Sequence, residues 1–589
     1  MIKRIGILVF LAGFLVSILV GCGGGGGGGG RVTFNAIADW TNYGNPISGN
    51  SQKWSLYNAN DSLVQTVAIN RDVAGEQTAP IPNLSKGVYR VKVELFSSRD
   101  LGGSIVGIIE ELITVNGTTS YRAAVGTDPA TVKVTPTAAT FKAGLGRQFY
   151  AAAYNAAGKP TFVAPGTFTW QTFGGVATVS PDGFVQGTSV GNGTVVATHG
   201  PSSLQGGSTL TIEANNPTTS KWTVLVYMNA ANDLYQFSDL NMNQMEKVAG
   251  NSDVRFVVQW KQSTNLFGGS SFNGTRRYLA KPDNSNSIAS ELIQNMGLNV
   301  DMGDKNTLLD FINWGKTFYP AQRYVLVIWN HGNGWRRGPG HDYPTRAVSY
   351  DDETGNAIQT WELAQALGSN HFDILAWDAS LMQMMEVAHE VKDHADYIVG
   401  SEESPPGEGY PYDLVFAPFR DNPDNTTLAL SKNFVDGTLL AYQGDNFAKI
   451  TQSVIDTTQM VALKNQIDAL ALELIANQGS LGTLIPQVRA GAKSYSPTSG
   501  RVYRDLWDVC DRIQNGTAIG TLQTACANVK TAIGNAIKWE GHNVNSNGSH
   551  GLSIDFSSSA QFSGQAGIDY LNLRFAIDTN WNEWLAIAP

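Results

Sequence analysis

Apolar and polar residues follow different patterns in the first and later parts of the chain. From residue 31 onward they alternate with a period of two in short runs, such as 87–95 and 105–115, which Gly, Pro, Asn and Ser interrupt. This alternation, with turn residues at short intervals, indicates antiparallel strands that bury one face. We therefore predict two all-β sandwich modules, at 31–128 and 129–216.

From residue 221 the apolar runs become nearly continuous, after a polar linker at 215–220. The strand-like runs include 222–227, 254–259, 324–329 and 372–377, and helical patterns between them include 235–248, 307–316 and 360–367. Strands that are buried on both faces and alternate with helices predict a parallel α/β sheet. We expect residues 221–589 to form this α/β domain, with added helices over about 425–540.

Length and composition narrow the classes of protein that fit. A chain of 589 residues is too long for one hydrophobic core, so several domains are expected. The apolar content of 42% excludes a mainly disordered chain, and the net charge of −10 argues against a nucleic-acid partner. We expect a monomer.

The N-terminus has the pattern of an export signal. Lys3 and Arg4 precede an apolar run at 5–20, and Gly21 and Cys22 follow it. This resembles a bacterial lipoprotein signal peptide, which implies cleavage after residue 21 and a lipid on Cys22. The glycines up to residue 30 would then be a flexible tether. An uncleaved membrane anchor is the alternative.

The residue after Cys22 is not Asp, which resembles the sorting of lipoproteins to the outer membrane. We therefore expect the chain in the bacterial cell envelope, lipid-anchored at the outer membrane or cell surface.

Cys510 and Cys526 are the other two cysteines, and both fall in predicted helices on either side of a turn. Export favours oxidation, and an antiparallel helix pair would bring the two cysteines level. Helix axes usually lie about 8–10 Å apart, which is wide for a disulfide. A disulfide and two buried free thiols both stay open.

Two strand ends carry candidate chemistry. The run ending at Trp377 continues into Asp378, Ala379 and Ser380, and the run ending at Trp329 continues into His331. In open α/β sheets, ligands bind beyond the carboxyl ends of the strands. If the two strands are neighbours, Ser380 and His331 would form a nucleophile and base pair.

Short blocks along residues 221–588 carry a family resemblance. They are 222–229, 232–234, 301–304 with 310–312, 329–332, 383–384 with 386–387, 395–403, 410–413 and 551–554. In this order they resemble the clostripain-like cysteine peptidases, relatives of the caspases and gingipains. The resemblance implies a caspase-like α/β domain with a mainly parallel sheet. Separately, residues 129–216 resemble bacterial Ig-like domains, with Trp170 in the core and a turn at Asp182 and Gly183.

The resemblance assigns roles to the two strand-end residues. His331 matches the general base of the family, whereas Ser380 stands where the family has its nucleophilic cysteine. A serine hydroxyl is not ionised near neutrality, so it needs a base during attack and a third group to orient that base. The motif supplies no evident third member. A natural loss of activity, a serine-using hydrolase and an introduced inactivating change all stay open.

The resemblance also implies a preference for Arg or Lys, because acidic residues line the family's substrate pocket. The matching positions are Asp378 and Glu408, where Glu replaces the more common Asp. A buried carboxylate that pairs with a basic side chain would provide this selectivity. Surface charge on a Pro- and Gly-containing loop is the alternative for Glu408.

No cofactor is required by the sequence, and no metal-binding motif is identified. Some relatives use Ca²⁺, and the acidic residues at 351–353 are the one candidate for it, with a solvated loop as the alternative. Relatives are often activated by cleavage at a basic residue between the His and Cys motifs. Arg336, Arg337 and Arg346 fall there, in a segment that we expect to be exposed.

The sequence thus predicts a lipid-anchored, extracytoplasmic clostripain-family homologue. Its lineage is that of Arg/Lys-directed endopeptidases, and Ser380 would reduce or abolish its activity. The partners expected are a peptide or protein substrate with Arg or Lys, and a membrane through Cys22. The alternative is a non-catalytic surface adhesin or peptide-binding pseudopeptidase.

Overall fold

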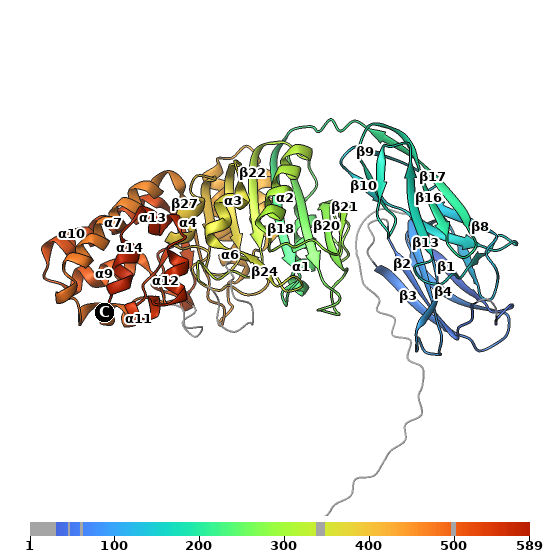
Figure 1. Ribbon diagram of the computed structural model, residues 1–589, viewed down its shortest axis with the longest axis horizontal. Helices are drawn as coiled ribbons and strands as arrows, with labels where there is room; N and C mark the ends of the chain where they lie inside the picture. The colour runs from blue at the N-terminus through green and yellow to red at the C-terminus, as the bar shows by residue number, and fades with distance from the viewer. Residues whose placement is uncertain (1–30, 45–46, 59–62, 337–347, 496–501) are drawn as a thin grey trace, which may run out of the picture.

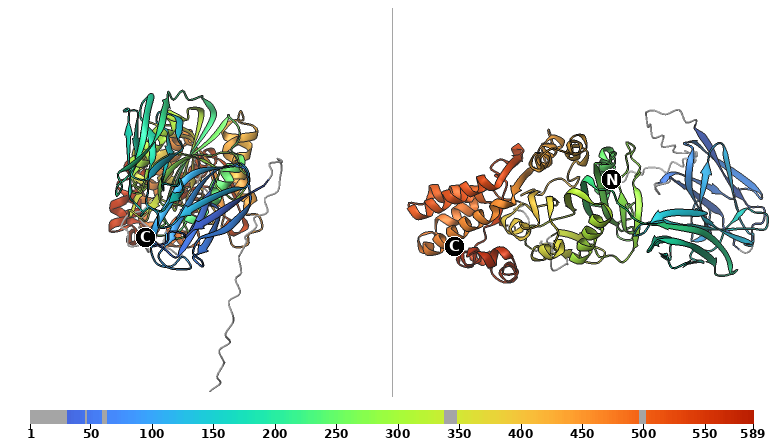
Figure 2. Two further views of the ribbon diagram at one scale, coloured as in Figure 1. Left: turned by 90° about the vertical axis from the view of Figure 1, so that its right-hand side faces the viewer. Right: turned by 90° about the horizontal axis from the view of Figure 1, so that it is seen from above.

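The computed structural model describes residues 31–44, 47–58, 63–336, 348–495 and 502–589. The expected signal peptide, Cys22 and the glycine tether lie outside these residues, as do Arg337 and Arg346. Within the described ranges, no helix has the length and apolar character needed to cross a membrane. The molecule is elongated, with β-strands at one end, a mixed sheet in the middle and helices at the other end (Figures 1 and 2).

The part of the chain up to residue 213 is built from strands, as the alternation predicts. One sheet has the order β4-β1-β7-β12-β11-β8 and packs against a second with the order β3-β2-β5-β6. Two further sheets have the orders β13-β16-β17-β9 and β10-β15-β14. The strands are β1 Val32–Asp39, β2 Ser51–Tyr57, β3 Leu63–Asn70, β4 Glu76–Leu84, β5 Gly87–Phe96, β6 Ile105–Val115, β7 Thr119–Ala124, β8 Thr131–Thr135, β9 Ala138–Lys142, β10 Gly146–Gln148, β11 Tyr150–Tyr154, β12 Pro160–Thr161, β13 Phe168–Phe173, β14 Ala177–Val179, β15 Phe184–Gly187, β16 Gly191–His199 and β17 Leu204–Glu213.

The chain on both sides of residue 128 shares one sheet and one core. Strand β12 pairs with β7 through Thr161 and Ala124, and Phe162 packs in the same apolar cluster as residues of β2. The buried carboxylate of Glu111 accepts hydrogen bonds from the hydroxyls of Tyr121 and Tyr154, and burial raises its pKa. The expected modules are therefore in close contact, which alternation alone does not reveal because it fixes faces and not pairing partners. Their division at residue 128 stays a prediction.

A nine-stranded sheet with the order β21-β20-β19-β18-β22-β25-β26-β27-β29 forms the middle of the molecule. Its central strands, from β19 to β26, are parallel, whereas both edges are antiparallel. The antiparallel flanks depart from a purely parallel sheet, and their strands lack the continuous apolar runs of the centre. The strands are β18 Ser220–Ala230, β19 Val254–Gln262, β20 Gly274–Leu279, β21 Glu291–Gly297, β22 Ala321–Trp329, β25 Phe372–Asp378, β26 Ala395–Gly400, β27 Thr451–Asp456 and β29 Ile537–His542.

Helices cover both faces of this sheet. Alternate residues of β18 belong to two apolar clusters: Val224 and Val226 pack with one set of helices, and Leu225 and Tyr227 pack with the other. The first set is α1 Tyr235–Val248, α5 Tyr412–Asp421 and α6 Thr427–Ala441. The second set is α2 Lys305–Phe318, α3 Leu363–Leu367, α4 Met385–Val391 and the helices that follow β27.

The helices after β27 form the far end of the molecule (Figure 1). They are α7 Met460–Ala476, α8 Leu484–Gly491, α9 Leu506–Gly516, α10 Gly520–Ala536, α11 Ser559–Phe562, α12 Gln565–Tyr570, α13 Arg574–Asp578 and α14 Trp581–Ile587, with short 3₁₀ turns η1 Thr360–Glu362, η2 Thr457–Gln459, η3 Gln478–Ser480 and η5 Val544–Ser546. Two small sheets lie beside the main one: β23 Val348–Asp351 pairs with β24 Asn356–Ile358, and β28 Tyr503–Asp505 pairs with β30 Ser553–Asp555.

The two cysteines lie on α9 and α10, as expected, and both are buried free thiols. Burial and the neighbouring Cys526 raise the pKa of the Cys510 thiol well above its ordinary value. Of the two arrangements that the sequence leaves open, the structure has the unbridged one.

The β-rich end contacts the edge of the central sheet. The side-chain amide of Gln294 on β21 donates to the carbonyl oxygen of Gly144 at 3.2 Å, and that of Asn295 donates to Asp182 at 2.7 Å. The edge strand β21 is thus covered by the segment around β10, which limits pairing with other chains.

Candidate active site

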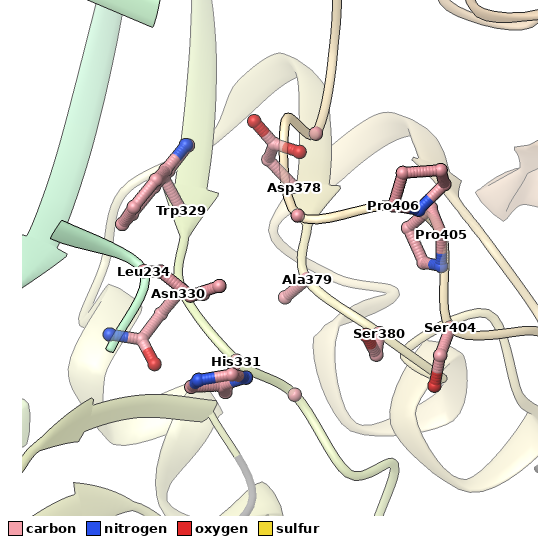
Figure 3. A pocket seen from close by; sticks show the side chains of 13 residues that line it. Leu234, Trp329, Asn330, His331, Asp378, Ala379, Ser380, Ser404, Pro405 and Pro406 are labelled. Atoms are coloured by element: carbon pink, nitrogen blue, oxygen red, sulfur yellow. The ribbon is translucent and has the colours of Figure 1, made fainter. Parts of the chain in front are cut away.

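His331 and Ser380 lie at the carboxyl edge of the central sheet, on neighbouring strands. Strands β22 and β25 are parallel, and Trp329 is in register with Asp378. His331 and Ser380 therefore each follow this registered pair at the same distance along the chain. Both line a cavity of about 340 Å³ (Figure 3). The prediction that the two strand ends meet is correct.

The backbones of the two loops approach so closely that a side chain would not fit between them. A Cβ atom on Gly332 would lie 2.4 Å from the carbonyl oxygen of Ser380. Leu381, which follows Ser380, has a φ of 65°, a conformation that costs a leucine about 1–2 kcal/mol. Its amide donates to the carbonyl oxygen of Glu403 at 3.3 Å, which helps to hold this strained corner.

His331 is hydrogen-bonded to a carboxylate that the sequence interpretation gave no role. Its Nε2 lies 2.5 Å from Oδ1 of Asp233, and its ring packs edge-on against Tyr350. Among the described residues, no hydrogen bond joins His331 to Ser380. The site therefore holds a hydroxyl, an imidazole and a carboxylate bonded to that imidazole, which are the groups that a nucleophile, its base and an orienting residue would require.

Asp233 follows β18, the parallel strand on the other side of β22, where Met228 is in register with Trp329. The carboxyl ends of adjacent parallel strands meet at one edge, so the position of Asp233 after this strand was the signal that could have identified it.

Asp378 is a buried carboxylate in the wall of the cavity. It accepts hydrogen bonds from the backbone amide of Tyr410 and from the hydroxyl of Tyr412, both at 2.9 Å. Burial raises its pKa to about 7, although the two hydrogen bonds act in the opposite direction. Gly409 has a φ of +65°, and a Cβ there would lie 2.4 Å from Asp378 Oδ1. The carboxyl group is thus held in place with no basic side chain bonded to it among the described residues.

Glu408 does not join Asp378 in the cavity. Its side chain is exposed, and Glu408 is absent from the lining of the cavity, although Gly407 and Gly409 line it. Its carbonyl oxygen accepts a hydrogen bond from Asn241 at 3.0 Å, and Asn241 Oδ1 accepts one from Trp329 Nε1 at 2.7 Å. Asn241 therefore fixes this loop to the end of β22, while the carboxylate of Glu408 points elsewhere.

The acidic residues at 351–353 have a basic partner within the chain. Lys261, whose side chain is fully buried, lies 2.8 Å from Asp351 and 3.1 Å from Glu353. Asp351 also accepts a hydrogen bond from the backbone amide of Met302 at 2.9 Å. Lys261 thus supplies positive charge at the position considered for Ca²⁺. No group of three or more His, Cys, Asp or Glu in the described ranges is placed to hold a metal ion, and the role of calcium is untested.

Arg336 is not the exposed residue that we expected. Its Nε lies 2.6 Å from Asp555, its side chain is only 14% exposed, and its backbone amide donates to the hydroxyl of Tyr503. Trp335 Nε1 also donates to Asp555, at 3.0 Å. The segment after His331 is therefore tied to β28 and β30, because Asp555 is a buried charge that requires partners.

The clostripain family model matches residues 226–586. This chain belongs to the clostripain family. The family resemblance carried by the sequence blocks is confirmed.

The chain is similar to clostripain from Hathewaya histolytica, with 27% identity over 259 residues, which is 39% of this chain and 49% of that protein. It spans about half the length of this curated relative.

Among solved structures, it is similar to an inactive zymogen C11 protease from Parabacteroides distasonis, with 20% identity and a TM-score of 0.48. A secreted C11 cysteine protease from Bacteroides thetaiotaomicron, in complex with an irreversible peptide inhibitor, gives the same identity and TM-score. Each match covers 62% of this chain and 99% of the other chain.

Proposed function

We propose that this clostripain-family chain binds peptides or proteins through an Arg or Lys side chain, and that it cleaves them slowly or not at all. The observation that carries the proposal is the buried carboxylate of Asp378 in the same cavity as His331 and Ser380. A basic side chain entering the cavity would pair with Asp378 and restore its charged form. A neutral side chain would leave a buried polar group without this partner.

The scissile carbonyl of such a peptide would lie next to Ser380. In the cysteine peptidases of this family a thiolate would attack there, but a serine hydroxyl must lose its proton to a base as the bond forms. His331 is the base at hand, and it would later donate that proton to the leaving amine. Slow turnover follows because no hydrogen bond prepares the hydroxyl for this transfer.

A serine-using hydrolase is the second candidate, and the contact between Asp233 and His331 favours it. A carboxylate at 2.5 Å from the imidazole is the third member that a serine nucleophile requires. Against it stands the exposure of this pair, since the Asp233 side chain is 73% exposed and an exposed pair is a weak orienting contact.

We also propose a location for the chain and a role for the part that precedes the peptidase domain. A lipid on Cys22 would anchor the chain to the bacterial cell envelope, with residues 1–21 removed and the glycines as a tether. The two β-sandwich modules would hold the peptidase domain away from the membrane. A surface adhesin or peptide-binding pseudopeptidase would be the outcome if Ser380 supports no turnover.

Turnover of fluorogenic peptides that end in Arg or Lys tests the proposal. We expect the natural chain to be slow and the Ser380→Cys variant to be faster by at least about a hundredfold, because a thiolate near an imidazole is the better nucleophile. His331→Ala in the Ser380→Cys background should abolish turnover. Equal rates for the natural chain and the Ser380→Cys variant, both lost on His331→Ala, would establish the serine hydrolase instead.

A further inference from the structure

Two exposed apolar side chains lie at the same edge of the sheet as the candidate active site. Phe447 is 94% exposed and Val544 is 76% exposed, the highest values among the large apolar residues of the described chain. Single exposed apolar residues are ordinary. Phe447 and Val544 differ from such residues because they lie at the edge of the sheet that carries Ser380.

The two side chains sit on loops that are bonded to each other. The side-chain amide of Asn543 donates to the carbonyl oxygen of Ala448 at 2.7 Å, and that of Asn545 donates to the same oxygen at 2.9 Å. Phe447 and Val544 are each adjacent to one of these residues in the chain. These hydrogen bonds hold the two loops together. Binding of a ligand would therefore cost little conformational entropy of the loops.

Both loops lie at the carboxyl edge of the parallel strands. Strand β27 runs antiparallel to β26, so its first residue, Thr451, lies beside the end of β26, and Thr451 Oγ1 accepts a hydrogen bond from the amide of Glu402 at 3.0 Å. Strand β29 ends at His542, which is in register with Thr451. The Phe447 loop enters β27 and the Val544 turn leaves β29 at this edge.

The segment before the Phe447 loop is also bonded to the wall of the cavity. The hydroxyl of Tyr442, which precedes the Phe447 loop, donates to the carbonyl oxygen of Gly409 at 2.9 Å, and Gly409 lines the cavity. Ser404 and Pro405 line it as well, and Figure 3 shows them on the side of Ser380 away from His331.

The chemistry of the proposed site fixes the direction of a bound peptide. His331 must deliver a proton to the leaving amine, so the part of the peptide after the scissile bond lies on the His331 side. The part before the bond would then extend from Ser380 in the opposite direction, toward the side of the sheet that carries β26, β27 and β29.

The distance matches a short extended segment. Neighbouring strands lie about 4.8 Å apart, so the three steps from β25 to β29 span about 14 Å, and an extended peptide covers this with about four residues at about 3.3 Å each.

We infer that Phe447 and Val544 form a binding surface for a bulky apolar side chain of the substrate, about four residues before the scissile bond. The inference rests on the proposed function of the same site and extends its selectivity beyond the Arg or Lys residue. The occupant is a peptide with a basic residue at the bond and a Leu or Phe near the fourth position before it.

The test uses the full chain with Ser380→Cys as the parent and fluorogenic peptides that end in Arg. In each peptide a single Leu replaces Ser at the second, third, fourth or fifth residue before the bond, counting Arg as the first. We expect the Leu peptide to gain about tenfold in kcat/KM, most at the fourth residue, because burying such a side chain is worth at least this factor. Phe447→Ala should reduce this ratio to about one, whereas Phe173→Ala, at a half-exposed phenylalanine on β13, should leave it unchanged.

A Leu preference that does not depend on Phe447, or no preference at any of the positions, would overturn the inference. A change in oligomeric state of Phe447→Ala without a change in the Leu ratio would also overturn it, and would assign the surface to contacts between copies of the chain.

If the parent cleaves none of the peptides, the proposed catalysis fails but the surface can still be tested. The same peptides, fluorescently labelled and ending in an Arg amide, are then measured for binding by fluorescence anisotropy. Tighter binding of the Leu peptide that is lost in Phe447→Ala supports the inference, and equal affinities overturn it.

Discussion

Ser380 changes what the neighbouring imidazole has to do. With a thiol at this position, His331 would need only to share a proton that the thiol loses readily, whereas a hydroxyl keeps its proton until attack. The orientation of His331 then matters more, and Asp233 is the residue that contacts its Nε2.

Replacing Asp233 tests this orienting role. In the Ser380→Cys background, Asp233→Ala should lower kcat about tenfold with KM unchanged, because the imidazole loses its partner but the peptide keeps its contacts. Asp413→Ala, which removes a carboxylate paired with Lys247 on the surface, is the control and should leave kcat unchanged. An increase in KM at constant kcat would assign Asp233 to substrate binding instead.

Asp378 lowers the stability of the folded chain near neutral pH. Its pKa is raised from 3.8 to about 7, so between these values the folded chain binds a proton that the unfolded chain has released. Stability therefore falls as the pH rises through this window, and the penalty is complete above about pH 7.

Asp378→Asn should remove this pH dependence. The free energy of unfolding of the variant relative to the natural chain should rise by about 2–3 kcal/mol between pH 5 and pH 8. Denaturant unfolding at the two pH values measures it, and Glu408→Gln, at an exposed carboxylate on the loop that contacts Asp378, is the control. A difference that stays constant between pH 5 and pH 8 would contradict the raised pKa.

At the scale of elements, strand β23, whose Tyr350 packs against His331, depends on a buried ion pair. Lys261 on β19 pairs with Asp351, and both side chains are fully buried. Lys261→Ala should destabilise the chain by about 3–5 kcal/mol, because it leaves a buried carboxylate without its cation. Lys247→Ala, in an exposed pair with Asp413, should cost less than about 1 kcal/mol. Equal small losses in urea unfolding would show that Asp351 finds other partners.

The elements that could be predicted are those whose pattern is local. The apolar runs identified the central strands, and their carboxyl ends correctly located His331 and Ser380. The contact between Asp233 and His331 was missed, although both residues follow ends of adjacent parallel strands, and the pairing of Lys261 with Asp351 could not be predicted because no local pattern joins these two residues. The sequence left Glu408 open between the pocket and the surface, because a loop motif does not fix where its side chain points.

At the scale of the whole molecule, the β-rich end is held together across residue 128. Phe162, which follows β12, is only 2% exposed and packs with residues of the first expected module. Phe162→Ala should therefore destabilise both modules together by about 3–5 kcal/mol in a single unfolding transition. Phe173→Ala, at a half-exposed phenylalanine, should have little effect. Two separate transitions, of which only one shifts, would show that the modules fold independently.

The central claim is that a basic side chain enters the cavity and pairs with Asp378 beside Ser380. Isothermal titration calorimetry of the natural chain with a peptide that ends in an Arg amide tests it most directly, because binding does not require turnover. The comparison peptide carries citrulline, which has the shape of Arg without its charge. We predict that the Arg peptide binds at least about tenfold more tightly than the citrulline peptide at pH 8, and that the advantage shrinks at pH 6 and disappears in Asp378→Asn. Equal affinities for the two peptides at pH 8 would contradict the claim.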